Sequence, residues 1–374
     1  FRYTDRKIRS IRSNPLNALP YDQIPKSVGG LTPIGTYFDG TIRPGTVFGT
    51  GSSGYRANTT DDYGGLNAFV LVDSNDEPRF PPRDGTEGTP ESLTANEVRT
   101  IIRNALTIAF RARAQIRRPL GSHAQVTVSV VDTNGSILGI ARTPDGPVFG
   151  TDVSLQKART AAFFSNTNTA ADLIRANLGN YWLAAKAVLG PGALSDGTAF
   201  ADRSGGNLSR PFFPDGIDGA PHGPFSKPFS EWSPFNVGLQ LDLIAANIVA
   251  HRSFLLGQSP TDTPMNCTPI PVRPQTSKSP VANGIQIFPG SVPIYRNNTL
   301  IGGIGVSGDG IDQDDMISFL GLHNAGLELG TGVGNAPRPI RADNLEVPGG
   351  RLRYVNCPFL PFLDSNEQTP CNGK

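Results

Sequence analysis

The sequence has few charged side chains, no dominant charge of one sign and no long apolar run. Only 17% of its 374 residues are charged, and 33 basic against 32 acidic residues leave a net charge of +1. Such a chain has no general attraction for nucleic acid or for an anionic membrane surface, so we expect neither as a partner. We also expect no membrane span, because no stretch approaches the roughly 18–20 apolar residues that one needs.

Cysteine is scarce as well. Cys267, Cys357 and Cys371 lack the spacing of zinc sites and of covalent haem attachment. A disulfide between Cys357 and Cys371 would close a short loop and leave Cys267 unpaired or in contact with another chain; three inert thiols are the alternative. The chain starts at Phe1 rather than Met, which favours a processed product and an extracytoplasmic, periplasmic or secreted, location.

Motifs of the common hydrolases, zinc proteases and kinases are missing, so we expect no catalytic residue. The glycines of GGIGVSGDG (302–310) fall within an expected strand and lack the GK[ST] of a phosphate loop, which favours close backbone packing or approach of a ligand. Carboxylates at 309, 312, 314 and 315 lack the EF-hand pattern and suit a helix start; the identity of any metal stays open.

Glycine and proline are abundant, at 43 and 33 residues, and favour long ordered loops. We divide the chain into a loop-rich N-terminal arm (1–90) with a strand at 67–74, a domain (91–330) interrupted by an insertion (178–284), and an extended C-terminal tail (331–374).

The first half of the domain predicts helix, hairpin, helix. Thr94 and Glu97 form a capping box before apolar residues at helical spacing. Alternating valines from 126 predict a strand, and Asn134-Gly135 predicts a two-residue type I′ turn into a strand over 136–142. A helix over 155–164 follows, capped by Asp152 or Ser154.

The second half repeats the hairpin and the helix. Residues 285–296 and 300–306 flank an Asn297-Asn298 turn, and Asp312 or Asp314 caps a helix over 316–329. Within the insertion, 170–189 and 236–256 have helical periodicity. This order predicts an α+β fold with an antiparallel β-sheet flanked by helices.

Four segments and their order resemble the GlcG/HbpS family over residues 93–177 and 285–330. They are VSVVDTNGSILGIAR (128–142), QKARTAAFF (156–164), PGSVPIY (289–295) and GGIGVSG (302–308), which precedes QDD (313–315). The resemblance implies a profilin-like α/β sandwich in which the hairpins 126–142 and 285–306 share one antiparallel sheet. It also implies binding of haem or a related tetrapyrrole.

The resemblance also implies a ligand site. Arg142 and Lys157 match family positions and would pair with ligand carboxylates; pairing of either residue with Asp132 is the structural alternative. The remaining candidates are the small-residue helix with Ala161 and Phe164, the Pro289-Gly290 loop, and Tyr295 and His251 as iron donors.

Three functions follow. The first is a non-enzymatic binding or assembly protein that binds haem or a related tetrapyrrole and forms a homo-oligomer, or joins other subunits, through the N-terminal arm and the C-terminal tail. The second is a structural subunit of an extracytoplasmic assembly, its pocket filled by aromatic residues of the insertion, namely Phe212, Phe213, Phe225, Phe229 and Trp232. The third is an enzyme with a cleft between the Pro289-Gly290 loop and the Lys157 helix.

Overall fold

The computed structural model describes residues 46–232, 238–263 and 267–374. Its centre is an antiparallel seven-stranded sheet with the strand order β1-β2-β4-β3-β6-β5-β7. The strands are β1 (Tyr55–Ala57), β2 (Phe69–Leu71), β3 (Thr127–Val131), β4 (Ile137–Arg142), β5 (Ser291–Arg296), β6 (Thr299–Ser307) and β7 (Val333–Asn335). A separate hairpin, β8 (Glu346–Val347) and β9 (Gly350–Arg351), lies in the C-terminal segment.

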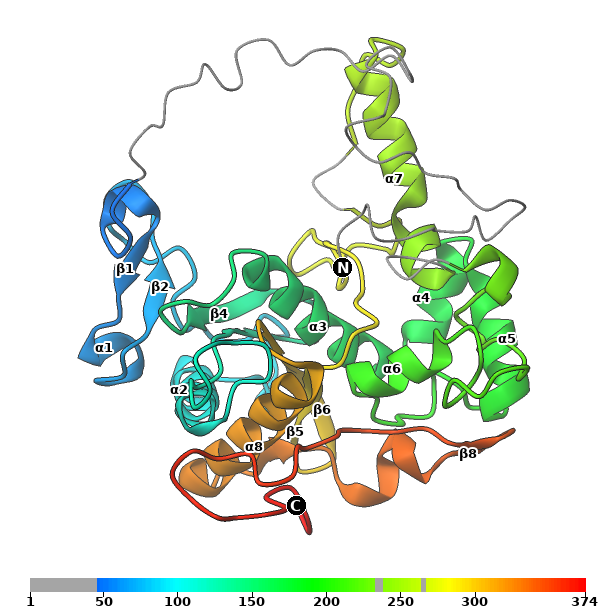
Figure 1. Cartoon of the computed structure of the whole chain (residues 1–374). Helices are drawn as coiled ribbons and strands as arrows, with labels where there is room; N and C mark the ends of the chain where they lie inside the picture. Colours follow the sequence, from blue (N-terminus) through cyan, green and yellow to red (C-terminus); the bar gives the residue numbers. More distant parts are fainter. Residues whose placement is uncertain (1–45, 233–237, 264–266) are drawn as a thin grey trace, which may run out of the picture.

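Helices surround this sheet, which confirms the predicted α+β class (Figure 1). They are α1 (Thr60–Tyr63), α2 (Ala95–Arg111), α3 (Gly150–Phe164), α4 (Thr169–Arg175), α5 (Gly179–Leu189), α6 (Asp202–Leu208), α7 (Leu239–Leu255) and α8 (Ile311–Leu329). Within the described residues, no helix combines the length and apolar character needed to cross a membrane.

The two predicted hairpins do share one sheet. β3 pairs with β4 on one side and with β6 on the other, and the second register places Val128 opposite Val306. The predicted N-terminal arm contributes β1 and β2, which extend the sheet beyond β4. Residues 1–45 of that arm lie outside the described residues.

Each face of the sheet packs against its own helices. Val126, Val128 and Val130 enter the main core with α2 and α8, whereas Val131 packs against α3. Gly303 and Gly305 let α3 lie directly on β6, because a Cβ at these positions would come 2.3 Å from Ala158 O and 2.0 Å from Ser154 O. Close backbone packing therefore explains the glycine-rich strand.

Local predictions failed at one turn and at two helix caps. Gly135 has a φ of +76° but Asn134 has no positive φ, so the first hairpin lacks a type I′ turn; the Gly135 amide instead donates to Asp132 O (3.1 Å). α3 and α8 begin after Phe149 and Gly310 without a side-chain cap. The capping candidates bind elsewhere: Asp152 accepts from Asn283, Ser154 bonds to Ser129, Asp312 accepts from Arg203 and Asp314 accepts from Lys157.

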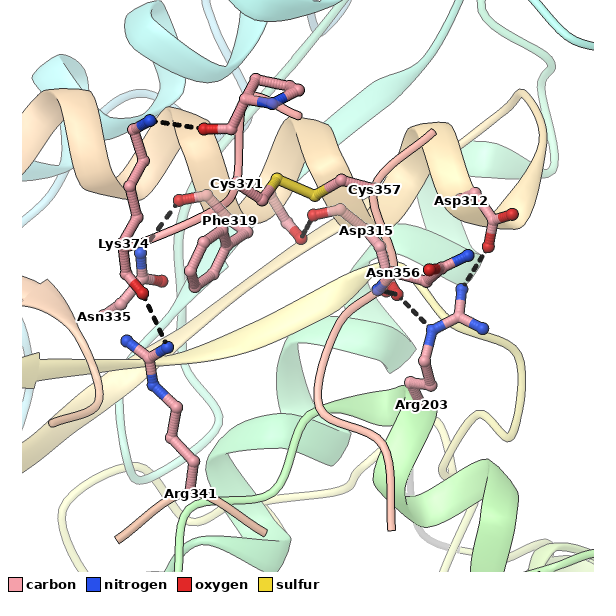
Figure 2. Close-up of a disulfide and its surroundings, with 12 residues drawn as sticks. Arg203, Asp312, Asp315, Phe319, Asn335, Arg341, Asn356, Cys357, Cys371 and Lys374 are labelled. Atoms are coloured by element: carbon pink, nitrogen blue, oxygen red, sulfur yellow. Dashed lines mark hydrogen bonds and ion pairs between the residues drawn. A yellow bond between two sulfur atoms is a disulfide. The ribbon is translucent and has the colours of Figure 1, made fainter. Parts of the chain in front are cut away.

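The insertion builds a second core onto the end of α3. Phe163 and Phe164 pack there with apolar residues of α4, α5 and α6 and of the loop that follows. The C-terminal half of α7 is largely exposed, and the helix extends away from the remaining elements (Figure 1). The C-terminal segment returns along α8, where the Asn356 amide donates to Asp315 Oδ2 (2.9 Å; Figure 2).

Candidate ligand-binding site

Lys157 is part of the folded interior. Its ammonium crosses from α3 to α8, donating to Val306 O and to Asp314 Oδ2, each at 2.8 Å, and both ion-paired side chains are 3% exposed. Gly290, after Pro289, has a φ of +135°, and a Cβ there would meet the Lys157 ammonium at 2.6 Å. The predicted loop and lysine therefore do come together, but around an internal ion pair.

Neighbouring carboxyl groups make this interior strongly polar. Burial raises the pKa of Asp314 to about 6, against the opposing effect of the Lys157 ammonium. Burial also raises the pKa of Asp315 to about 6, although its Oδ2 accepts from Arg203 Nε at 2.5 Å (Figure 2). Asp202 is buried beside these groups, and its pKa lies well above the usual value for the same reason.

The alternative pairing of Lys157 or Arg142 with Asp132 is wrong. Asp132 instead accepts hydrogen bonds from the backbone amides of Thr86 and Ser136, both at 2.8 Å. Its position at the hairpin turn explains the bond from Ser136, whereas Thr86 reaches it from the segment before α2.

Arg142 lies in a different environment from Lys157. Its guanidinium carbon is 4.6 Å from the centroid of the Tyr55 ring on β1, and burial lowers its pKa. Arg142 therefore contacts the β1 side of the sheet, while Lys157 contacts β6 and α8. The structure therefore does not place Arg142 and Lys157 together at one ligand site.

The small-residue face of α3 packs on the sheet, where Ala158 and Ala162 lie beside Val131, and only the end of the helix contacts the insertion. Ala161 is buried, and the Phe164 ring stacks on Phe225 with 5.3 Å between centroids. Of the other aromatic residues, Phe213 joins the same core, while Phe212 stacks on the half-exposed Phe229. The sheet thus occupies the alanine face where a flat ligand was predicted, and the insertion packs on Phe163 and Phe164 at the end of α3.

Tyr295 is remote from this surface. It packs in the main core with α2 and α8, on the sheet face opposite α3, and burial raises its pKa. A phenolate donor at Tyr295 therefore does not share a cleft with Ala161 and Phe164.

His251 lines an open groove of about 810 Å³ between α7, the start of α3 and the side chains of Asp262, Thr263, Cys267 and Asn283. Its apolar walls include Ile244, Ile248 and Leu255, and its polar walls include Arg252 and the exposed free Cys267. Ile248 and Leu255 are 54% and 68% exposed. Of the predicted site residues named above, His251 alone faces this groove.

A carboxylate orients the His251 ring. Nδ1 lies 2.7 Å from Asp262 Oδ1, and this hydrogen bond holds the pKa of Asp262 below its usual value. A carboxylate only accepts, so Nδ1 of the neutral ring carries the proton and Nε2 keeps a free lone pair. Metal-binding histidines commonly have this arrangement.

Sequence reasoning missed three contributors to this region. Asp262 and Arg252 line the groove, and buried Arg159 ties α3 to its floor by donating to Asn283 Oδ1 (2.6 Å) and Gly135 O (2.9 Å). Arg252 follows His251 directly, so adjacency to a candidate donor was an available signal. Asp262 and Arg159 gave no such signal in the sequence, because the residues that they contact are not their neighbours along the chain.

Comparisons with known proteins agree with the sequence resemblance. The family model described as "Haem degrading protein HbpS-like" matches residues 246–322, which include His251, Lys157's partner Asp314 and strands β5 and β6. A search of curated proteins finds no match.

Two solved structures are also similar. The crystal structure of a PduOC–haem complex is 17% identical, with 66% of this chain and 99% of that chain covered and a TM-score of 0.29. The Klebsiella pneumoniae protein ORFY is 18% identical, with 64% and 94% covered and the same TM-score. The family model alone confirms the predicted resemblance to HbpS-like proteins, and its match spans residues 246–322.

Proposed function

We propose that this chain is a non-enzymatic binding protein that holds haem or a related tetrapyrrole in the groove beneath α7. One observation carries the proposal: an apolar groove contains His251, whose ring is oriented by Asp262 at 2.7 Å. Haem binding requires an apolar slot, an axial donor and cationic partners for the propionates, and the groove contains apolar walls, His251 and one such cation, Arg252.

The groove suits a flat apolar ligand in size and surface. Its volume of about 810 Å³ lies within the usual ~300–1,000 Å³ of small-molecule sites. Ile248 and Leu255 project into it with more than half of their surfaces exposed. A ligand that covers them gains on the order of 25 cal/mol per Å² of apolar surface removed from water.

The polar groups of the groove have distinct roles in this proposal. Nε2 of His251 is the iron donor, since Asp262 occupies Nδ1. Arg252, next to it on α7 and on the same groove, pairs with a propionate. The family match over 246–322 includes His251 and Arg252 and supports a tetrapyrrole as the ligand.

A haem titration tests the proposal. Haemin added to the full chain should give a saturable Soret band at one haem per chain. His251→Ala should weaken binding at least tenfold and shift the band, because the axial donor is lost. His222→Ala is the matched control, since His222 bonds to its neighbouring carbonyl in an exposed loop and is not among the groove residues. Absence of saturable binding, or equal affinity in His251→Ala, contradicts the proposal.

The proposal includes assembly with further copies in an extracytoplasmic compartment. Val249 of α7 and Leu256, which follows the helix, are 61% and 53% exposed, and apolar side chains on a projecting helix favour a protein contact. The Cys357–Cys371 disulfide supports an oxidising compartment. Light scattering on purified protein should give an oligomer that Val249→Glu dissociates; a wild-type monomer contradicts assembly without affecting haem binding.

A further inference from the structure

The short helix α6 anchors the insertion to both α8 and the C-terminal segment. On α8, Arg203 donates from Nε to Asp315 Oδ2 (2.5 Å) and from Nη2 to Asp312 Oδ1 (2.6 Å; Figure 2). On the C-terminal segment, the Arg353 amide donates to Asn207 Oδ1 of α6 (3.0 Å). Polar contacts of α6 thus hold three parts of the fold together.

The first residue of α6, Asp202, has a fully buried carboxyl group. The residue is 0% exposed, and within the described residues neither carboxyl oxygen makes a hydrogen bond of normal geometry. Its polar neighbours are the hydroxyl groups of Ser291 and Thr160 and the charged groups of Lys157 and Asp315. An ionised carboxylate in this position would lose its hydration without full replacement, so the protonated form is favoured.

The charges around Asp202 balance when this residue holds a proton. Asp314 pairs with Lys157 at 2.8 Å and Asp315 pairs with Arg203 at 2.5 Å, and all four side chains are at most 9% exposed. These four residues and Asp202 form the α6 cluster. Each buried cation of the cluster has its own carboxylate, so Asp202 is a third carboxyl group. Burial raises its pKa well above the usual value, against the opposing effect of the Lys157 ammonium.

The other ionisable groups described around the α6 cluster face solvent or stay neutral. The Asp312 side chain is 31% exposed, and Arg210 and Arg353 are exposed to solvent. Tyr354 of the C-terminal segment stays neutral, because burial raises its pKa. The proton on Asp202 therefore keeps the buried part of the cluster electrically neutral.

We propose that the proton on Asp202 latches α6 onto α8, and that α6 and the C-terminal segment that it holds are released as the pH rises. In the released state the carboxyl group meets water and gives its proton to the solvent. Because the closed state keeps this proton, each pH unit favours release about tenfold until Asp202 ionises in the closed state as well.

The release is local and independent of haem. The sheet keeps its own hydrogen bonds, since β3 pairs with β4 and with β6. No residue of the α6 cluster lines the α7 groove. The latch therefore responds to pH whether or not the groove holds a ligand.

Infrared spectroscopy in D₂O tests whether Asp202 holds the proton. At pH 8 Asp314 and Asp315 are ionised, because burial raises the pKa of each only to about 6. The spectrum of the wild type minus that of Asp202→Asn should therefore show the carbonyl band of one protonated carboxyl group. A carboxylate band in its place overturns the proposal.

Limited digestion with trypsin tests the release, because Arg203 is a cleavage site that is 8% exposed in the closed state. Between pH 7 and pH 9, cleavage after Arg203 should rise at least tenfold after correction for the activity of trypsin on a peptide at each pH. Cleavage after Arg142, which is buried in β4, should not rise.

Asp202→Asn should remove this rise, because its carboxamide stays neutral at every pH. Asp196→Asn is the matched control: it removes an exposed carboxylate shortly before α6, and it should behave as the wild type. Unchanged cleavage after Arg203 in the wild type, or the same rise in Asp202→Asn, overturns the proposal.

Discussion

Replacing Lys157 by Met should destabilise the protein, because the change leaves a buried carboxylate without its counterion. In the native state the ammonium donates to Val306 O and Asp314 Oδ2, both at 2.8 Å, and both ion-paired side chains are 3% exposed. Methionine keeps most of the aliphatic stem, so the substitution removes mainly the charge and its hydrogen bonds.

The loss in the free energy of unfolding caused by Lys157→Met should depend on pH. Removing one partner of a buried ion pair costs about 3–5 kcal/mol in the free energy of unfolding. Burial has already raised the pKa of Asp314 to about 6. At pH 8 the wild-type carboxylate is ionised and paired, so the variant loses the full attraction. At pH 5 the carboxyl is protonated with or without Lys157, so the cost should shrink to about 1–2 kcal/mol, the contribution of the lost hydrogen bonds.

Urea unfolding of the wild type and Lys157→Met at pH 8 and pH 5 measures both values. The double variant Lys157→Met/Asp314→Leu is the control, and it should recover most of the stability at pH 8, because apolar replacement of both partners is often neutral. A loss below about 1 kcal/mol at pH 8, or an equal loss at both pH values, would refute this reasoning.

Three further predictions concern stability. Cys357→Ser/Cys371→Ser opens a loop with a sequence separation of 14 and should cost about 3 kcal/mol in urea unfolding; unchanged stability under oxidising conditions contradicts this. Burial raises the pKa of Asp202, so the native state binds this proton more tightly than the unfolded state and the free energy of unfolding falls as pH rises. Asp202→Asn should make that fall less steep between pH 5 and pH 8; the same pH dependence as in the wild type contradicts this prediction. Phe225→Ala removes a buried ring stacked on Phe164 and should cost about 3–5 kcal/mol by chemical denaturation; a loss under 1 kcal/mol would show that the insertion is loosely packed.

Local sequence signals predicted the sheet and its helices well. The Thr94–Glu97 capping box forms as predicted: the Thr94 amide donates to Glu97 Oε2 (2.9 Å) and the Glu97 amide donates to Thr94 Oγ1 (3.3 Å). Alternating valines in β3 identified a strand, and the family resemblance joined it to β6 across the insertion. Both kinds of signal can be recognised from short sequence segments or from the order of those segments along the chain.

The candidate site was less predictable because tertiary contacts create it. Lys157 was singled out by the resemblance, but its partner Asp314 lies far along the chain and was expected to cap a helix. His251 was singled out as a donor, but the groove exists only because α7 lies beside α3 and Asp262 reaches the imidazole. Periodicity in the α7 sequence shows a helix and does not show which face stays uncovered.

The haem affinities of two substituted proteins distinguish the α7 groove from the interior around Lys157 as the ligand site. Ile248 is 54% exposed in the groove, so Ile248→Glu should fold and place a charge against the ligand. Soret titration should show at least tenfold weaker binding for Ile248→Glu and near wild-type binding for Lys157→Met, measured at pH 6 in protein shown to be folded. Loss of binding in Lys157→Met with full affinity in Ile248→Glu would contradict the account.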